Sequence, residues 1–257
     1  MSIHPTAIVH EEAEIHPQAE VGPYCVLGPR VRIGAKTRIG PHVVIAQNTT
    51  LGEENRVFQF ASLGEVPQDL KYAGEQTQLV IGDRNTIREC ATLHIGTEGG
   101  GGKTQLGDDN LVMAYSHVAH DCKIGNHCIL ANAVNLAGHV EVGDCVIMGG
   151  LSAVHQFTRI GKHAFISGGS MVTMDVLPYC IAQGDRAELA GLNKVGLTRH
   201  GFGQEQQERI KEAYRILFRS QLSLSEALGR LKETYAGQAE IEELIRFIEG
   251  SKRGMTR

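Results

Sequence analysis

The chain has 257 residues, with 25 Lys and Arg against 29 Asp and Glu, so its formal net charge is −4. This balance gives no electrostatic case for nucleic acid as a partner. No apolar run approaches the roughly 20 residues that a membrane-spanning helix needs, and the first residues resemble no secretion signal. We therefore expect a cytoplasmic protein with no transmembrane segment, in which the six cysteines are reduced thiols.

Aliphatic residues recur at a strict interval of six through most of the chain. An α-helix repeats every 3.6 residues and an isolated strand every two, so neither explains this interval. It is typical of a parallel β-helix built from hexapeptides, in which each aliphatic residue points inward. The positions in phase are Ile3, Val9, Ile15, Val21, Leu27, Ile33, Ile39, Ile45, Leu51, Val57 and Leu63, then Ile81, Ile87 and Leu93, and finally Leu106, Val112, Val118, Ile124, Leu130, Leu136, Val142, Met148, Val154, Ile160, Ile166 and Val172.

Small or β-branched residues stand two positions before most of these aliphatic residues. Cys25, Cys122 and Cys128 occupy this place, which indicates a packing role for the three thiols. We expect the small residue to let the chain turn each corner of the coil.

The six-residue period is interrupted near residues 64–78 and again near residues 94–105. Both interruptions predict loops extruded from the β-helix, which are either functional or tolerated insertions. The run from Gly99 to Thr104 resembles a phosphate-binding loop. However, that motif needs Gly where Thr97 stands and a strand before a helix, so we interpret the run as a flexible loop.

Beyond Val172 the period decays, and from about residue 190 the pattern becomes helical. Apolar positions at helical spacing predict helices over 204–219 and 239–249, and Ser223 with Glu226 forms a capping box that opens another. We therefore divide the chain into a β-helix over residues 1–189 and an α-helical domain over residues 190–257. The second part has a net charge of +3, from 12 Lys and Arg less 9 Asp and Glu. That excess suits an acidic partner, but ordinary solvated helix faces explain it equally well.

Four histidines are predicted to gather on one flank of the β-helix. Three hexads make one triangular coil of 18 residues, and successive coils stack about 4.8 Å apart. Residues 18 apart, such as Val118 and Leu136, then lie above one another. The histidines that this geometry brings together are His117, His120, His139 and His155.

These residue types suit acid–base chemistry. A neutral imidazole can act as a general base near neutral pH. Asp121 directly follows His120 and could orient its ring. Because neighbouring residues on a strand point to opposite faces, a contact between the two side chains needs a corner or a bend. Gly138 would let a backbone N–H approach a reacting carbonyl as an oxyanion donor. Zinc held by three histidines is the alternative, but the spacing of His117 and His120 does not match the β-helical carbonic anhydrases. We therefore expect no metal.

Six segments of the sequence carry a more specific signal. They are Phe60 to Glu65, Gln68 to Glu75, His117 to Cys122, Leu136 to Val140, Ala153 to Phe157 and Arg199 to Phe202. Together they resemble the acyl-[acyl carrier protein]–UDP-N-acetylglucosamine O-acyltransferase family over essentially the whole chain. The resemblance implies an all-β left-handed parallel β-helix with a C-terminal α-helical domain, and the handedness comes from this resemblance alone.

The resemblance also implies an activity and partners. Members of this family transfer a 3-hydroxyacyl group from acyl carrier protein to the 3-OH of UDP-N-acetylglucosamine, which is the first step of lipid A biosynthesis. A homotrimer with active sites between neighbouring β-helices is implied, with no cofactor beyond the phosphopantetheine arm of the donor. Basic residues of the helical domain would meet the acidic carrier protein.

Roles for individual residues follow from the same resemblance. His120 would be the general base, Asp121 its support, and the Gly138 N–H the oxyanion donor. Gly168 matches the position that limits acyl length, and glycine there predicts a donor chain longer than ten carbons. The remaining positions would bind substrate: Asp69 and Lys71 would contact sugar and acyl group, His117, His139, His155 and Gln156 would line the site, and Asn193 and Arg199 would hold the nucleotide.

Two departures from the family pattern lie near the expected nucleotide end. The family usually has two adjacent arginines before Gly201, where this chain has Arg199 and His200, and it often has an acidic residue where Val195 stands. A 3-amino sugar acceptor is an open alternative. The related N-acyltransferase normally carries an extra N-terminal domain, for which hexads starting at Ile3 leave no room. A non-enzymatic β-helical scaffold is the remaining alternative.

Overall fold

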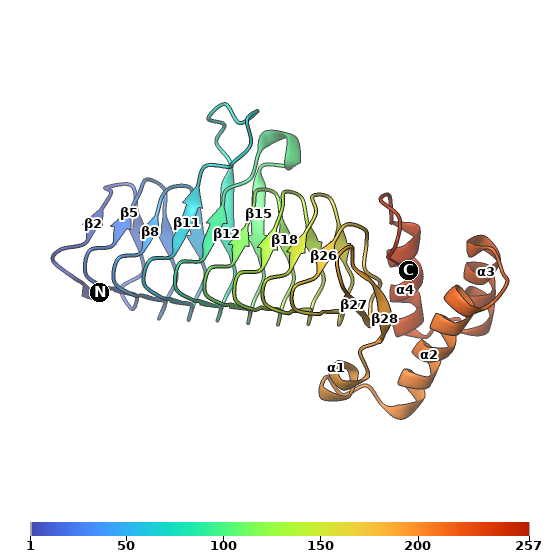
Figure 1. Cartoon of the computed structure of the whole chain (residues 1–257). Helices are drawn as coiled ribbons and strands as arrows, with labels where there is room; N and C mark the ends of the chain where they lie inside the picture. The colour runs from blue at the N-terminus through green and yellow to red at the C-terminus, as the bar shows by residue number, and fades with distance from the viewer. Residues whose placement is uncertain (1, 257) are drawn as a thin grey trace.

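The computed structural model describes residues 2–256, which form a triangular β-helix followed by α-helices (Figure 1). Most strands have only two residues, because each one forms a single short side of a coil. Strands of successive coils pair in parallel and build three sheets, which we call A, B and C. The parallel β-helix predicted from the six-residue period is therefore confirmed.

Each coil contributes one strand to each sheet, in the chain order A, B, C. Sheet A contains β1 (Ser2–Ile3), β4 (Glu20–Val21), β7 (Arg38–Ile39), β10 (Arg56–Val57), β13 (Thr86–Ile87), β16 (Leu111–Val112), β19 (Ile129–Leu130), β22 (Ile147–Met148), β25 (Phe165–Ile166), β27 (Cys180–Gln183) and β28 (Glu188–Leu192). Sheet B contains β2 (Ile8–Val9), β5 (Val26–Leu27), β8 (Val44–Ile45), β11 (Ser62–Glu65), β14 (Thr92–His94), β17 (His117–Val118), β20 (Asn135–Leu136), β23 (Ala153–Val154) and β26 (Met171–Val172). Sheet C contains β3 (Glu14–Ile15), β6 (Arg32–Ile33), β9 (Thr49–Leu51), β12 (Gln78–Ile81), β15 (Lys103–Leu106), β18 (Lys123–Ile124), β21 (Glu141–Val142) and β24 (Arg159–Ile160).

The aliphatic residues of the six-residue period form the core. Val118 pairs with Leu136, which in turn pairs with Val154, so residues 18 apart lie directly above one another as predicted. Each of these side chains is at most 2% exposed. Stacking of coils with equivalent geometry thus buries a continuous aliphatic column. Such burial between neighbouring repeats supplies most of the stabilisation of a repeat protein.

The corners of the coil are made by residues in the left-handed region of backbone space. Tyr115, Asp121 and His127 have φ values of 62°, 61° and 55°, and such residues recur every six positions. The small residue after each one is buried, as at Ser116 and Cys122. A left-handed non-glycine residue costs about 1–2 kcal/mol, so the stacked coils impose these turns against local preference.

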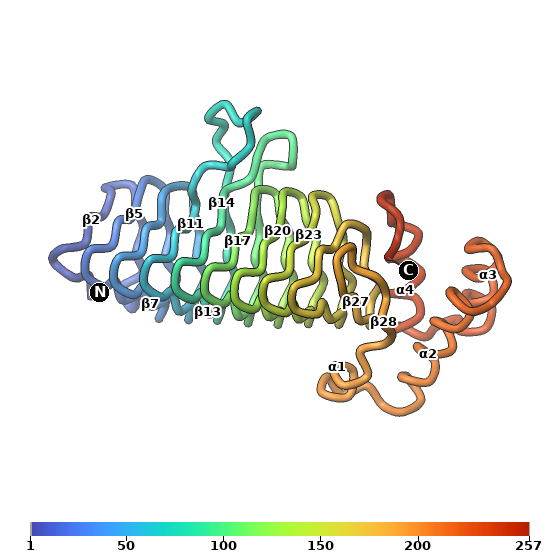
Figure 2. The backbone as a smooth tube through the Cα atoms, in the orientation of Figure 1, coloured from blue at the N-terminus to red at the C-terminus, as the bar shows by residue number. Residues whose placement is uncertain are grey.

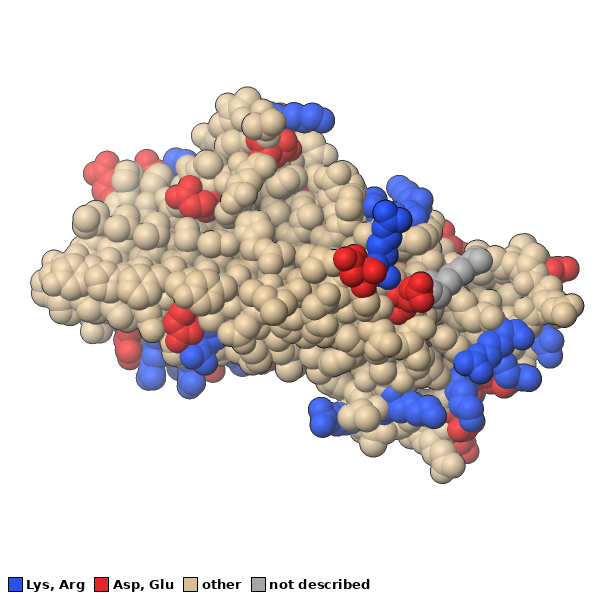
Figure 3. Space-filling model, in the orientation of Figure 1, with Lys and Arg blue, Asp and Glu red and all other residues tan. Residues whose placement is uncertain are grey.

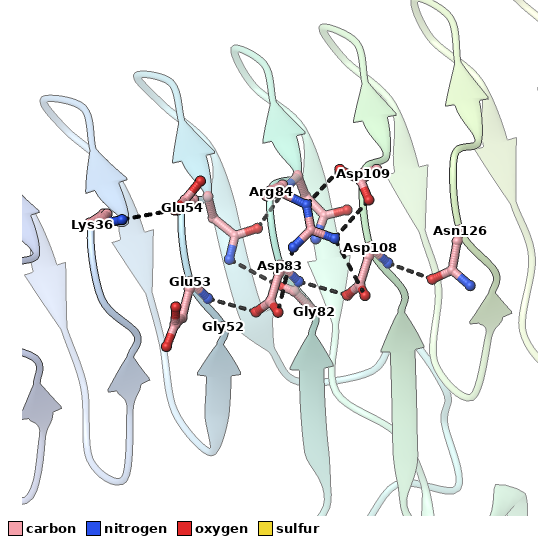
Figure 4. A network of polar contacts seen from close by, with 12 residues as sticks. Lys36, Gly52, Glu53, Glu54, Gly82, Asp83, Arg84, Asp108, Asp109 and Asn126 are labelled. Atoms are coloured by element: carbon pink, nitrogen blue, oxygen red, sulfur yellow. Dashed lines mark hydrogen bonds and ion pairs between the residues drawn. The ribbon is translucent and has the colours of Figure 1, made fainter.

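Side chains on the edge between sheets C and A satisfy the backbone of the neighbouring coil. Asp83 accepts a hydrogen bond from the Glu53 N–H at 2.7 Å, Asp108 accepts from the Asp83 N–H at 2.8 Å, and Asn126 accepts from the Asp108 N–H at 2.8 Å (Figure 4). Asp144 continues this ladder by accepting from the Asn126 N–H at 2.9 Å. The ladder satisfies N–H groups that the tight corners leave without a strand partner.

Both interruptions of the period are loops at the edge between sheets B and C. One runs over residues 66–77 from β11 to β12, and the other runs over residues 95–102 from β14 to β15. They rise beside each other from this edge (Figures 1 and 2). The second contains a 3-10 turn over Glu98–Gly100, and β15 begins at Lys103, so the end of the run from Gly99 to Thr104 belongs to a strand; the flexibility of the loop stays a prediction.

Beyond the coils, β27 and β28 form an antiparallel hairpin that leads into four α-helices. The helices are α1 (Lys194–Arg199), α2 (Gln204–Arg219), α3 (Leu224–Thr234) and α4 (Ala239–Glu249). The predicted helices at α2 and α4 are confirmed, and Ser223 caps α3 with Glu226 as predicted. The domain boundary after residue 189 falls inside β28 and stays a prediction. Within residues 2–256, no helix has both the length and the hydropathy to cross a bilayer.

Candidate active site

His120 and Asp121 form a directly hydrogen-bonded pair at the edge between sheets B and C. Their chain neighbours β17 and β18 lie in different sheets, so the two residues sit at a corner rather than on a strand. Because Asp121 adopts a left-handed φ of 61°, its carboxylate turns back toward the ring that precedes it. The Nδ1 atom of His120 lies 2.8 Å from Oδ2 of Asp121. The corner that this pairing requires is therefore present.

The loop over residues 95–102 holds the Asp121 carboxylate in place. Thr97 donates its backbone N–H to Oδ1 at 2.8 Å and its hydroxyl to Oδ2 at 2.7 Å. Asp121 donates its own N–H to the Thr104 hydroxyl at 2.8 Å. The Asp121 side chain is 0% exposed, so these bonds offset the cost of burying its charge. A Cβ at Gly100 would collide with this carboxylate, so the loop needs glycine there.

Gly138 lies against the His120 ring, one coil above it. A Cβ at Gly138 would come within 2.6 Å of His120 Cε1 and 2.7 Å of Nε2, so only glycine leaves room for the ring. Among residues 2–256, no acceptor receives the Gly138 N–H. Gly138, whose N–H is unpaired, therefore packs against the side of the His120 ring that carries Nε2, the nitrogen that Asp121 leaves unpaired.

His139 completes the group around the carboxylate. Its Nε2 lies 3.7 Å from Asp121 Oδ2, its ring meets the His120 ring edge to face at 5.1 Å, and it stacks on Phe157 at 4.3 Å. Burial lowers the pKa of His139, partly opposed by the negative charges of Asp121 and Asp69. The ring is therefore neutral at pH 7, when it can donate or accept a hydrogen bond.

His117 lies deeper, beside a histidine that the sequence pattern did not identify. Its Nδ1 is 2.7 Å from the Thr92 hydroxyl, and its ring meets the buried His94 ring edge to face at 4.8 Å. Burial lowers the pKa of His117 to about 4, with the charges of His94 and His120 adding to the effect. Burial lowers the pKa of His94 too, and its Nδ1 has no hydrogen-bond partner among the described residues.

Two predicted binding residues lie one coil above Gly138 and remain exposed. His155 donates from Nδ1 to its neighbour Gln156 O at 3.1 Å and makes no ring contact with the other histidines of the described chain. Gln156 precedes Phe157, whose N–H donates to Gly138 O at 3.1 Å, so it lies directly above Gly138. Of the four histidines expected to cluster, the structure thus brings His120 and His139 into contact and leaves His155 free on the surface.

Asp69 and Lys71 lie on the other extruded loop, at the same edge. Asp69 accepts a hydrogen bond from the Lys71 N–H at 3.0 Å, which closes a tight turn. The charge of Asp69 acts on His139, so the turn lies near the histidine group. Tyr72 anchors the loop by donating its hydroxyl to Glu75 O at 2.9 Å and by packing on the core.

A cavity of about 670 Å³ opens beside the histidine group. Asp121, His139 and Phe157 form one wall, and residues at the end of the helical part form another. Its cationic lining residues are Lys123, Arg159, Lys252 and Arg253. Two of these cations are engaged by Glu141, at 3.7 Å from Lys123 and 3.3 Å from Arg159. Three carboxylates also line the cavity, those of Asp121, Glu141 and Asp175, so the four cations leave a small excess of positive charge beside His139, which suits an anionic substrate.

Three further predicted residues lie away from the edge that carries the histidine group. Gly168 lies at the edge between sheets A and B, where its Cβ would meet only the backbone of Gly150. Asn193 lies near the edge between sheets C and A, where its amide donates to His163 O at 2.9 Å and its Oδ1 accepts from Gly196 N–H at 3.0 Å. Arg199 is exposed in the last turn of α1. One chain therefore does not bring these three residues to the histidine group.

Sequence reasoning missed Thr97, Gly100 and His94. In the sequence Thr97 stands out only as a mismatch to the phosphate-loop pattern, and its contact with Asp121 joins residues 24 positions apart. His94 ends the strand before the second loop, and the pairing of β14 with β17 brings it beside His117. The expectation that residues 18 apart lie above one another could not identify these residues, because the two loops lengthen the coils that carry them.

Comparison with known proteins identifies relatives over the full length. A family model described as Udp N-acetylglucosamine O-acyltransferase, Domain 2, matches residues 175–256, and a bacterial transferase hexapeptide model matches residues 12–47 and 103–138. The acyl-[acyl-carrier-protein]–UDP-N-acetylglucosamine O-acyltransferase of Myxococcus xanthus is 64% identical, over 99% of both chains. The protein of the same name from Anaeromyxobacter is 56% identical, over 100% of both chains.

Solved structures show the same likeness. The UDP-N-acetylglucosamine acyltransferase of Francisella novicida superposes with a TM-score of 0.97 at 44% identity, covering 99% of this chain and 94% of its own. The O-acyltransferase of Moraxella catarrhalis gives 0.97 at 47% identity, over 100% of both chains. These likenesses confirm the predicted left-handed β-helix with its helical C-terminal part. The chain belongs to the acyl-[acyl-carrier-protein]–UDP-N-acetylglucosamine O-acyltransferase family.

Proposed function

We propose that this protein transfers a 3-hydroxyacyl chain from acyl carrier protein to the 3-OH of UDP-N-acetylglucosamine, the first step of lipid A biosynthesis. Relatives that bear the name of this activity cover essentially the whole chain. The observation that carries the chemistry is the His120–Asp121 pair at 2.8 Å, with Gly138, whose N–H is unpaired, packed against the His120 ring. Acyl transfer to a hydroxyl needs a base and an oxyanion donor in this arrangement.

The pairing assigns a role to each atom of the site. Asp121 accepts the Nδ1 proton of His120 and so fixes the tautomer whose Nε2 is free to accept a proton. Nε2 takes the proton of the sugar 3-OH while that oxygen attacks the thioester carbon. The Gly138 N–H donates to the oxyanion that forms. When the carbon–sulfur bond breaks, the imidazolium returns its proton to the departing phosphopantetheine thiol, so His120 ends neutral.

Substrate binding is assigned to the residues around this pair. We propose that neutral His117 and His139 position the sugar, with Asp69 and Lys71 reaching it from their loop. His155 and Gln156 would meet the substrate on the coil above. The cationic lining of the 670 Å³ cavity suits a diphosphate or the phosphate of the pantetheine arm. The Asn193 amide already bonds within the chain, so Arg199 is the freer of the two proposed nucleotide ligands.

A homotrimer would unite residues that one chain keeps on different edges. Gly168, the histidine group and Asn193 lie at three different edges of the prism, and Arg199 lies in α1, so a shared acyl and nucleotide site needs neighbouring copies. Large apolar side chains stand in a row on the edge between sheets A and B: Tyr24, Phe60, Tyr115 and Leu151, each more than 50% exposed. Such a row is typical of a surface covered by another subunit. Light scattering on the purified protein would test for three chains per particle.

The donor and the location follow from charge and thiol chemistry. Lys and Arg gather over the helices at the C-terminal end (Figure 3), and we propose that this surface meets acyl carrier protein, an acidic partner. All six cysteines are free thiols, which supports a reducing, cytoplasmic location. We propose no resident cofactor and no catalytic metal for the transfer step.

The test is acyl transfer to UDP-N-acetylglucosamine with wild type, His120→Ala and the control His16→Ala. Loss of the base should reduce turnover by about 10²–10⁴-fold, and the exposed His16, far along the β-helix, should leave turnover unchanged. The oligomer and the circular dichroism of both variants should match wild type. Full activity of His120→Ala would overturn the base assignment. Transfer only to the 3-amino sugar would replace the acceptor and keep the mechanism.

A further inference from the structure

The edge between sheets C and A carries a second cluster of ligating side chains, separate from the histidine group. Cys145 and His163 occupy equivalent corners one coil apart, with left-handed φ values of 59° and 57°. His163 donates its N–H to Asp144 O at 2.9 Å, so the two coils are in register at this point. Equivalent corners direct their side chains outward from the same edge, which brings the thiol and the imidazole together.

The third member comes from the helical part. His200 is the C-cap residue that follows α1, and its ring meets the His163 ring edge to face at 5.0 Å. Ligating atoms of Cys145, His163 and His200 all lie within 4.8 Å of one another. The Asn193 amide, bound to His163 O, and the Phe202 ring, 5.0 Å from His163, hold α1 against this corner. The ligands are thus fixed by packing on both sides.

An unpaired buried atom also suits a ligand here. The Nδ1 atom of His163 is buried and has no hydrogen-bond partner among residues 2–256. A buried nitrogen without a partner is unfavourable, and ligation would satisfy it.

We propose that Cys145, His163 and His200 form a transition-metal site that takes Zn²⁺, with one sulfur and two nitrogen ligands and a fourth position for water. A thiolate with two imidazoles is a ligand set of zinc rather than of magnesium or calcium. On binding, the Cys145 thiol loses its proton to solvent and its sulfur bonds the metal. The bound metal joins α1 to the β-helix.

Cobalt substitution tests the site on the full-length protein, because Co²⁺ bound to a thiolate gives a charge-transfer absorption band. Chelator-treated wild type should bind one Co²⁺ per chain with this band, and Zn²⁺ should displace the cobalt and remove it. The variants Cys145→Ala and His200→Ala should each abolish the band or weaken Co²⁺ binding at least tenfold. His200 is exposed, so its variant should fold normally.

Two control variants exclude the other sources of a signal. His139→Ala disrupts the His120–Asp121–His139 set, which offers no sulfur, and should keep the band. Cys90→Ala removes a half-buried thiol elsewhere and should keep it too. Zn²⁺ should raise the Tm of wild type and both controls but not of His200→Ala. A wild type without the band, or a band undiminished in His200→Ala, would overturn the proposal.

Discussion

Thr97 and Asp121 are joined by two hydrogen bonds, from the threonine N–H at 2.8 Å and from its hydroxyl at 2.7 Å. The pair links the second extruded loop to the carboxylate that orients His120. The loop that interrupts the six-residue period therefore holds in place the corner that carries His120, the proposed general base. Both oxygens of a fully buried carboxylate are satisfied in this way, which leaves Oδ2 aligned on the His120 ring.

Removal of the Thr97 hydroxyl should impair turnover without unfolding the protein. A hydrogen bond to a charged group is worth about 1.5–3 kcal/mol, so Thr97→Ala should lower kcat by roughly tenfold to a hundredfold as Asp121 loses its alignment. Thr97→Ser keeps the hydroxyl and should stay within about threefold of wild type. The measurement is kcat at saturating donor and acceptor. Equal kcat for Thr97→Ala and wild type would show that Asp121 does not depend on this bond.

Two adjacent glycines of the same loop offer a matched pair. A Cβ at Gly100 would collide with the Asp121 carboxylate, whereas a Cβ at Gly99 meets nothing within 4 Å. Gly100→Ala should therefore displace Asp121 and reduce kcat. The reduction should be about tenfold if Asp121 loses one hydrogen bond, and up to about 10⁴-fold if the carboxylate no longer orients His120. Gly99→Ala should leave kcat unchanged. If the two variants behave alike, the packing of Gly100 on Asp121 is not what the active site requires.

Gly168 should determine the preferred donor. Its Cβ would meet no side chain, and the nearest atom is Gly150 O at 3.2 Å, so a larger residue would project outward from this edge. With glycine there, the protein should transfer acyl chains longer than ten carbons in preference to the ten-carbon chain when donors of 10, 12, 14 and 16 carbons compete in one assay. Gly168→Met should shift the preference to shorter chains while the rate with the shortest donor persists. A wild type that prefers the ten-carbon donor contradicts this prediction.

Acid should destabilise the fold through two half-buried histidines. His117 and His163 have pKa values of about 4 in the folded state, lowered mainly by burial, against an ordinary value of 6.5. Between pH 6.5 and pH 4 the unfolded chain binds the extra protons, so the unfolding free energy falls as pH falls through this window. The slope is at most about 1.4 kcal/mol per pH unit for each ring, and partial exposure makes it smaller.

The variant His117→Gln isolates one of these contributions. Glutamine keeps a polar partner for the Thr92 hydroxyl but does not titrate, so the pH dependence of stability should become shallower. Denaturant unfolding at several pH values between 4 and 6.5, at one protein concentration, measures both slopes. A slope that is the same in variant and wild type would show that His117 is not protonated on unfolding in this range.

The sequence by itself determined the β-helix and the helices at α2 and α4, whereas the corner that the pairing of His120 with Asp121 requires was found only in the structure. The β-helix and the helices follow from local spacing, because stacked coils repeat every 18 residues and helices every 3.6. The same spacing placed His139 beside His120, as the 5.1 Å ring contact confirms. It also predicted a cluster of four histidines, of which His155 stays apart on the surface.

Only the tertiary structure decided how the two loops return to the β-helix. The contacts of Thr97 with Asp121 and of His94 with His117 could not be predicted from spacing. The inserted residues break the six-residue period, so the distance in sequence no longer gives the position along the β-helix. The approach of His200 to Cys145 and His163 likewise depends on how α1 folds back onto the last coils. A fixed repeat makes contacts along a column of the β-helix predictable from sequence. Contacts made by the inserted loops and by the C-terminal helices depend on side-chain packing that does not follow the repeat.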